Sequence, residues 1–275
     1  MAFVKPDQVL KNMIQVGAQK SRLSVKDLLI RGGLSGALLG FATTLAFTAE
    51  IQSDMGILGA ILFPAGFVII ILLGLELVTG NFALIPTAVL HKQTTIQKML
   101  SNWFWVIIGH LIGCGLYALL FILSETKLGQ VSDSIMIEKL IVVSEAKTIG
   151  YASLGTEGLV VVFIKAMLCN WMVTLGAVMA MTAKSTIGKI AAMWLPVMTF
   201  FAQGFEHAVV NMFVIPAGMM LGANVSMFDW WYWNQFPVTI GNIVGGFLFT
   251  GLALYVTYNK QESKVIVKMS KTKTL

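Results

Sequence analysis

The 275-residue chain has few charged side chains. Asp, Glu, Lys and Arg make up 12% of its residues, whereas 57% are hydrophobic. A soluble domain carries about a quarter of charged residues, and a chain this apolar would expose large hydrophobic patches to water. The scarcity of charge therefore excludes an ordinary soluble domain and predicts an all-α integral membrane protein.

Cysteine and histidine are also scarce. The two cysteines, Cys114 and Cys169, lie within apolar segments, so no disulfide framework is expected. The three histidines lie on different segments, and the chain has neither a paired-cysteine motif nor a phosphate-binding glycine loop. We therefore predict no metal, no cofactor and no enzymatic reaction. The first 26 residues lack the compact apolar core of a cleavable signal peptide.

Six apolar segments are long enough to cross a bilayer, which takes roughly 20 residues. The second and fifth segments are too long for one simple crossing, and each is interrupted by glycine, asparagine, a charged residue and proline. Irregular backbone at membrane depth must lie against protein or a water-filled cavity, so the two broken segments predict a central pathway. The six segments are 28–48, 57–90, 101–124, 158–183, 190–223 and 233–258.

The placement of basic residues predicts the orientation in the membrane. Fifteen lysines and arginines lie in the two terminal segments and in the loops around residues 92–98 and 184–189, and they are too dispersed for nucleic-acid binding. The opposite loops contain only Lys127, Lys139 and Lys147. We therefore expect a cell-membrane protein with cytoplasmic N- and C-termini.

The chain then divides into three parts. Residues 1–26 form a cytoplasmic N-terminal segment, for which an amphipathic helix is favoured over a disordered tail. Residues 27–258 form the transmembrane domain, and residues 259–275 a basic cytoplasmic tail. The long connection over 125–157 is expected to fold partly over the outer surface.

An internal repeat is the most informative pattern. The segments GLELVTGNFALIP (74–86) and GFEHAVVNMFVIP (204–216) share Gly, Glu, Asn, Ile and Pro at one constant offset of 130 residues. Each repeat, 27–124 and 158–258, holds three crossings, so the two must enter the membrane in opposite directions. Such inverted repeats place the substrate path at their interface, between discontinuous helices.

The remaining segments of the two repeats also align. Asn102 matches Asn234 in the third and sixth segments, and Arg31 matches Lys165 in the first and fourth. Matched glycines spaced four residues apart predict close helix packing: Gly109 with Gly113, and Gly241 with Gly245.

Polar groups at membrane depth are costly and mark functional sites. His207 and Thr79 break the repeat symmetry, because their partners are Leu77 and Val209. Histidine changes charge near neutral pH, with an unperturbed pKa of ~6.5, so transport chemistry is predicted at this asymmetric pair. His110, on the unbroken third segment, is interpreted as a core residue. Four symmetric residues are expected to support the helix breaks by satisfying backbone donors: Glu76, Glu206, Asn81 and Asn211.

The motifs GFEHAVVNMFVIP, LELVTGN (75–81) and LCNWMV (168–173) together resemble the formate/nitrite transporter family over essentially the whole chain. The resemblance implies a homopentamer of aquaporin-like protomers, each with its own pore. It implies His207 at the pore centre, Thr79 facing it, and Asn170 orienting the histidine by hydrogen bonding. It also implies a lysine that attracts anions to the outer vestibule, for which Lys147 is the candidate. Two apolar constrictions are implied at Phe63, Phe67, Leu77, Val78, Val173 and Phe200.

We therefore predict a passive, pH-sensitive channel or transporter for a small monovalent anion or its conjugate acid. Formate is the first candidate, but Leu75, Val78, Thr174 and Gly176 depart from the usual family residues and leave the substrate open. Nitrite, hydrosulfide, acetate and lactate remain alternatives. A neutral-solute channel would carry paired Asn-Pro-Ala motifs and an ammonium channel paired pore histidines, and the sequence has neither. The expected partners are the anion, the lipid bilayer and further copies of the chain.

Overall fold

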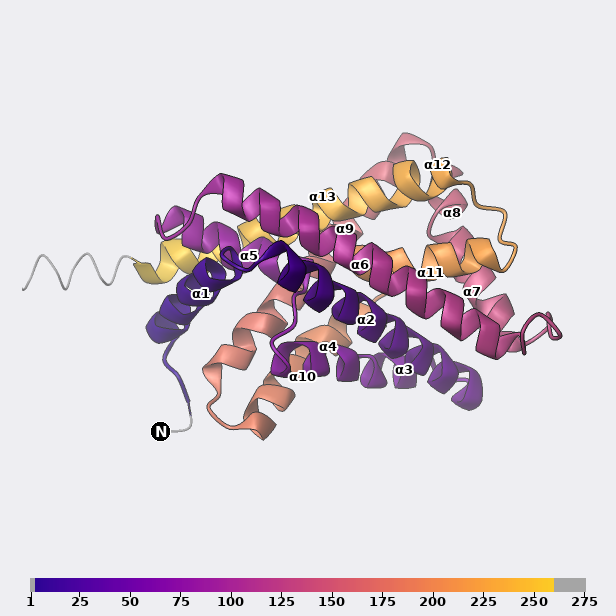
Figure 1. Cartoon of the computed structure of the whole chain (residues 1–275), viewed down its shortest axis with the longest axis horizontal. Helices are drawn as coiled ribbons and strands as arrows, with labels where there is room; N and C mark the ends of the chain where they lie inside the picture. Colours follow the sequence, from indigo (N-terminus) through magenta and orange to yellow (C-terminus); the bar gives the residue numbers. More distant parts are fainter. Residues whose placement is uncertain (1–2, 260–275) are drawn as a thin grey trace, which may run out of the picture.

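A computed structural model describes residues 3–259, and nearly all of them are helical (Figure 1). Four helical stretches are long and apolar enough to cross a membrane, and they correspond to the first, third, fourth and sixth predicted segments. The predicted tail falls, apart from Asn259, outside the described residues. The four stretches are α2 (Val25–Ser53), α6 (Ile96–Glu125), α9 (Thr156–Met179), which runs on as a 3-10 turn (Ala180–Thr182), and Met227–Asn259.

The second and fifth spans are broken, as the sequence predicts. The chain turns at Gly74 with φ of +65° and at Gly204 with φ of +62°, a left-handed conformation that glycine adopts without steric cost. A half-helix therefore starts inside the molecule in each repeat. The second span comprises α3 (Gly56–Leu62), α4 (Pro64–Leu72) and α5 (Val78–Leu90), and the fifth comprises α10 (Thr186–Ala202) and α11 (Ala208–Met220).

The two half-helices, α5 and α11, run from the centre of the protein towards opposite faces (Figure 1). We call the face on which both ends of the described chain lie the terminal face, and the other the opposite face. Helix α1 (Pro6–Lys20) lies on the terminal face and packs against α5. Helix α7 (Ile135–Ala146) covers α11 on the opposite face and is followed by α8 (Ile149–Ala152).

The spaced glycines bring helices into close contact, as predicted. A methyl group on Gly113 in α6 would collide with the backbone of Gly33 in α2, and one on Gly245 would collide with the backbone of Met167 in α9. Equivalent pairs of spans thus pack at equivalent glycines in both repeats. This close approach fixes the frame into which the broken spans fit.

The sixth span is less regular than its sequence suggests. A capping box of Ser226 and Asp229 starts α12 (Met227–Trp230), and a π-helical turn (Trp231–Gln235) precedes α13 (Phe236–Gly246). A second π-helical turn covers Phe247–Leu252. Each such turn shifts the register of the face that follows it.

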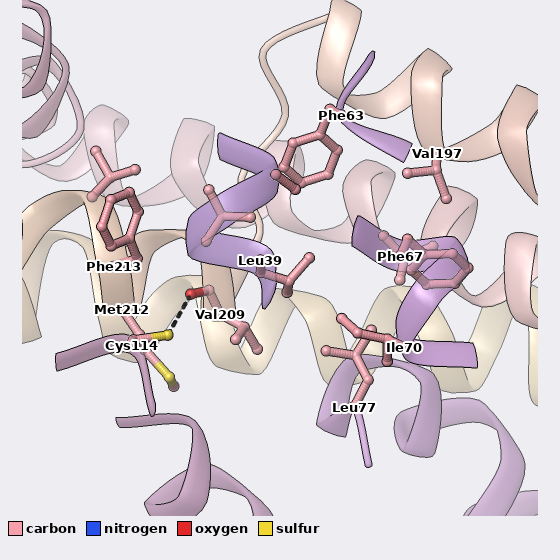
Figure 2. Packing of buried hydrophobic residues seen from close by; sticks show 14 of the residues in the cluster. Leu39, Phe63, Phe67, Ile70, Leu77, Cys114, Val197, Val209, Met212 and Phe213 are labelled. Carbon is pink, nitrogen blue, oxygen red and sulfur yellow. Dashed lines mark hydrogen bonds between the residues drawn. The ribbon is translucent and has the colours of Figure 1, made fainter. Parts of the chain in front are cut away.

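A buried apolar cluster holds the broken spans together. Side chains from α2, α4, α10 and α11 interlock in it, and no charged group enters the part shown in Figure 2. The thiol of Cys114 lies 3.6 Å from the Val209 carbonyl, and both cysteines are buried and unpaired. Figure 2 labels Leu39, Phe63, Phe67, Ile70, Leu77, Val197, Met212 and Phe213 among the cluster residues.

Candidate functional site

The N-termini of the two half-helices meet at Thr79 and His207. Thr79 is the second residue of α5, and His207 is the N-cap of α11. Their side chains join through Thr79 Oγ1 and His207 Nε2 at 3.1 Å, and both are buried. The positive ends of two helix dipoles therefore converge on one hydroxyl–imidazole pair, which we call the central pair.

Hydrogen bonding sets the tautomer of His207. The backbone N–H of Val210 donates to His207 Nδ1 at 3.2 Å, so Nδ1 must be an unprotonated acceptor. A neutral imidazole then carries its hydrogen on Nε2 and donates it to the Thr79 hydroxyl. The hydroxyl hydrogen of Thr79 is left available to donate to a third group.

Asn170 lies at the central pair but does not bind the histidine. Its Nδ2 donates to the carbonyl of Thr79 at 3.1 Å and to that of Asn242 at 2.6 Å, which leaves no hydrogen for His207. The expectation that Asn170 orients the imidazole is therefore wrong. Asn170 instead ties the first turn of α5 to the sixth span, and Val210 orients the histidine.

Two further side chains cap the half-helices. His110 Nε2 accepts from the backbone N–H of Val78 at 3.1 Å, while its Nδ1 donates to the Gly32 carbonyl at 2.7 Å. Asn242 does the same in the second repeat, accepting from the N–H of Ala208 at 2.9 Å. His110 is thus a helix cap, a role that its interpretation as a core residue missed. Its alignment with Asn242 in the repeat was the signal for it.

The symmetric glutamate of the first repeat forms a buried polar cluster. Glu76 accepts hydrogen bonds from Lys20 at 2.7 Å and from Asn81 at 2.8 Å. The amide of Asn81 also donates to Asn102 at 2.9 Å, and Asn102 donates to the backbone carbonyl of Lys20 at 3.0 Å. A closed ring of four side chains, from four segments, therefore surrounds the break.

The second repeat reproduces this ring on the other side of the centre. Glu206 accepts from Lys147 and from Asn211, each at 2.8 Å, and Asn211 donates to Asn234 at 2.8 Å. The two rings show that the asparagines and glutamates support the breaks through one another. The expectation that these glutamates satisfy backbone donors is wrong, because side-chain donors hold both carboxylates.

Tyr151 makes the second ring different from the first. Its hydroxyl donates to Glu206 Oε1 at 2.8 Å. Burial, with the carboxylate of Glu206 adding to it, raises the pKa of Tyr151, so the hydroxyl stays a donor. Sequence alignment at the repeat offset could not reveal either lysine, because Lys20 and Lys147 lie 127 residues apart instead of 130.

The six residues predicted for the constrictions are all buried and belong to the apolar cluster. The ring of Phe200 stacks on the imidazole of His207 with centroids 5.7 Å apart, and Phe63 meets Phe200 edge-on, also at 5.7 Å. Aromatic surface therefore covers one side of the central pair.

A cavity of about 1280 Å³ opens on the terminal face, between α1, α4 and α10. Its walls include the Lys20–Glu76 ion pair and Leu75, next to the break in the second span. Three further cations line it: Arg31, Lys184 and Lys189. The cavity leads from the terminal face to the first ring.

The family model of formate/nitrite transporters matches residues 7–256, which is nearly the whole chain. The chain belongs to the formate/nitrite transporter family. It is 34% identical to an uncharacterized transporter, YrhG, of Bacillus subtilis, with 95% of this chain and 96% of the relative covered. It is 33% identical to the formate channel BtFdhC of Bacillus thuringiensis, with 96% of this chain and all of the relative covered.

Solved structures of this formate/nitrite transporter family share the fold. An FNT family ion channel superposes with a TM-score of 0.79 at 25% identity, covering 91% of this chain and 98% of the other. A pentameric formate channel with bound formate superposes with a TM-score of 0.68 at 24% identity, covering 85% of this chain and 97% of the other. The chain is therefore a multi-pass membrane protein with an inverted repeat of three plus three spans and an aquaporin-like protomer.

Proposed function

We propose that this member of the formate/nitrite transporter family passes a small monovalent anion, or its conjugate acid, through each protomer by passive, pH-sensitive diffusion. The convergence of two half-helix N-termini on the central pair carries the proposal. Helix N-termini bind anions because their free N–H groups and positive dipole ends point at the ligand. The protein acts as a channel or transporter and not as an enzyme.

The central pair offers one directed donor to such an anion. Because Val210 fixes the tautomer of His207, the hydroxyl hydrogen of Thr79 points away from the imidazole. An anion that leaves water for an apolar constriction loses several kcal/mol of hydration. The Thr79 hydroxyl, polarised by the imidazole behind it, replaces part of that hydration at the centre of the pathway.

Proton movement at this site requires a change at Nδ1. For His207 to give a proton to a weak-acid anion it must first be protonated there, which displaces the N–H of Val210 from its acceptor. Acidic conditions thus charge the imidazole while releasing one helix-capping bond. The neutral acid formed by proton transfer crosses the apolar rings far more easily than the anion, so flux should rise as pH falls.

Formate is the substrate we favour, since the relative in Bacillus thuringiensis is named a formate channel. Nitrite, hydrosulfide, acetate and lactate are the alternatives within the family, because a few apolar side chains set the pore width. We place the constrictions at the six buried residues around the central pair, with Phe63 and Phe200 beside His207. The pentameric neighbour supports a homopentamer, and the excess of lysine and arginine supports cytoplasmic termini in the cell membrane.

His207→Asn tests the proposal in proteoliposomes. Asparagine is a good N-cap and preserves the start of α11, but it cannot titrate. We expect formate flux to lose its rise at acidic pH and to fall by at least about tenfold there, the range seen when a positioned acid–base group is removed. His91→Asn, in a loop of the terminal face, is the matched control and should leave flux unchanged. Unaltered pH dependence in His207→Asn would contradict the role of the histidine.

Thr79 is tested by two substitutions of similar size. Thr79→Ser keeps the hydroxyl that accepts from His207, and we expect it to retain most of the flux. Thr79→Val removes the hydroxyl and leaves Nε2 without its partner, which costs about 1–3 kcal/mol for a buried donor. Flux in Thr79→Val should fall by at least about tenfold relative to Thr79→Ser. Equal flux in the two variants would show that the hydroxyl does not contact the substrate.

A further inference from the structure

Arg31 and Lys165 occupy equivalent places in the two repeats. Arg31 precedes Gly32, whose carbonyl accepts the hydrogen bond of the capping His110 at 2.7 Å. Lys165 precedes Ala166, whose carbonyl accepts the hydrogen bond of the capping Asn242 at 2.8 Å. The structure thus confirms the weak sequence alignment of these cations, and it places each next to a contact that supports one half-helix.

Neither cation is matched by a buried carboxylate. The carboxylate nearest to Arg31 in the described chain is that of Asp27, at 3.9 Å and with 46% of its side chain exposed. Such an exposed pair one helical turn apart contributes little. Lys165 has no carboxylate within 4.0 Å in residues 3–259, and its ammonium group lies 5.9 Å from the centre of the Tyr151 ring. Both side chains therefore keep their charge available.

The lysines of the two rings differ in this respect. Lys20 binds Glu76 at 2.7 Å and Lys147 binds Glu206 at 2.8 Å, and both carboxylates are almost completely buried. In each ring the positive charge is compensated by a negative charge at contact distance. An approaching anion therefore meets little net charge from Lys147, the residue expected to attract it.

Each unmatched cation lies beside one of these neutral rings. Arg31 lines the cavity of the terminal face together with Glu76 and Lys20. Lys165 lies over Tyr151, whose hydroxyl binds Glu206 in the opposite ring. The two cations are thus placed symmetrically on either side of the central pair, next to the point where each half of the pathway reaches its ring.

We propose that Arg31 and Lys165 attract the small monovalent anion to the two mouths of the pathway, whereas Lys20 and Lys147 serve the structure. This inference rests on the proposed function. Charges of one sign near low-dielectric walls raise the local concentration of an oppositely charged solute and its rate of entry, by an amount that falls steeply with ionic strength. Salt dependence is therefore the signature that separates attraction from a structural role.

The test compares formate permeability of proteoliposomes at about 0.01 M and about 1 M ionic strength, where the Debye length is about 30 Å and about 3 Å. We expect Arg31→Gln and Lys165→Gln each to lower permeability at least about threefold at low salt. The difference from the parent protein should vanish at high salt. Arg31→Lys and Lys165→Arg retain the charge and should behave like the parent.

Lys98→Gln and Lys127→Gln are the matched controls, because each removes one exposed positive charge from a loop on the same face as the cation it matches. They should change permeability little at either salt concentration. Parental permeability of both Gln variants at low salt, or a deficit that persists at high salt, would overturn the inference. A parent protein that carries neither formate nor the alternative anions would instead overturn the proposed function, and this inference with it.

Discussion

Glu206 is a buried carboxylate that depends on three side chains for its charge. Lys147 supplies a counter-ion at 2.8 Å, and Asn211 and Tyr151 donate hydrogen bonds. Removing one partner of a buried ion pair leaves an uncompensated charge, which costs far more than the pair itself contributes. At the scale of residues, the two rings therefore act as units whose members cannot be removed singly.

Lys147→Met tests this dependence. We expect the variant to lose about 3–5 kcal/mol of stability, the usual cost of orphaning a buried charge, measured as a lower unfolding temperature in detergent. The double variant Lys147→Met/Glu206→Gln should recover much of the loss, because its amide needs no counter-ion.

Lys139→Met provides the comparison at a half-exposed pair. Lys139 binds Glu50 at 3.0 Å, with 35% of the lysine side chain exposed. Its loss should cost no more than about 1 kcal/mol. A double variant as unstable as Lys147→Met would show that Glu206 does not need its counter-ion.

At the scale of elements, close packing of the unbroken spans positions the half-helices. Gly32 in α2 receives the hydrogen bond of His110 from α6, and this contact is possible because glycines keep the two backbones together. His110 then caps α5. A shift of α6 away from α2 would therefore be transmitted to the first turn of α5, where Thr79 lies.

Gly113→Ala tests this packing against a neighbour on the same helix. The added methyl group would meet the backbone of Gly33, and backbone cannot yield as a side chain does. We expect a loss of at least about 1–3 kcal/mol, as for overpacking in a tight core, together with reduced flux. Gly115→Ala meets no atom within 4 Å and should be neutral or slightly stabilising, because alanine favours helix over glycine. Equal thermal stability of the two variants would refute the close contact.

At the scale of the whole molecule, the two repeats make faces that differ in charge. Both ends of the described chain lie on the face that also carries the basic loops around residues 92–98 and 184–189 (Figure 1). Lysines and arginines of short loops stay on the cytoplasmic side during insertion. The whole molecule should therefore have one fixed orientation.

Cysteine labelling in intact cells checks this orientation. The native Cys114 and Cys169 are buried and should give little background. We expect Lys127→Cys to react with a membrane-impermeant maleimide from outside. Lys98→Cys should react only after the membrane is permeabilised. Labelling of Lys98→Cys in intact cells would reverse the orientation.

The sequence predicted the fold well because its repeat contained costly residues. Apolar matches arise easily between membrane segments, but glycine, glutamate, asparagine and proline in one register do not. The broken spans, the inverted topology and the meeting of Thr79 with His207 all follow from that register. The pairing of Lys20 with Glu76 was not predictable, because α1 and α7 join their repeats at different offsets.

The sequence by itself determined which segments enter the membrane, where two of them break, and which residues differ between the repeats. These properties depend on hydropathy and on backbone preferences that are local along the chain. Only the tertiary structure decided the partners of the polar side chains. Asn170 binds the carbonyl of Thr79, His110 caps α5, and Lys147 is compensated by Glu206. A buried polar group takes whichever partner packing brings within reach, and spacing along the chain does not set that distance.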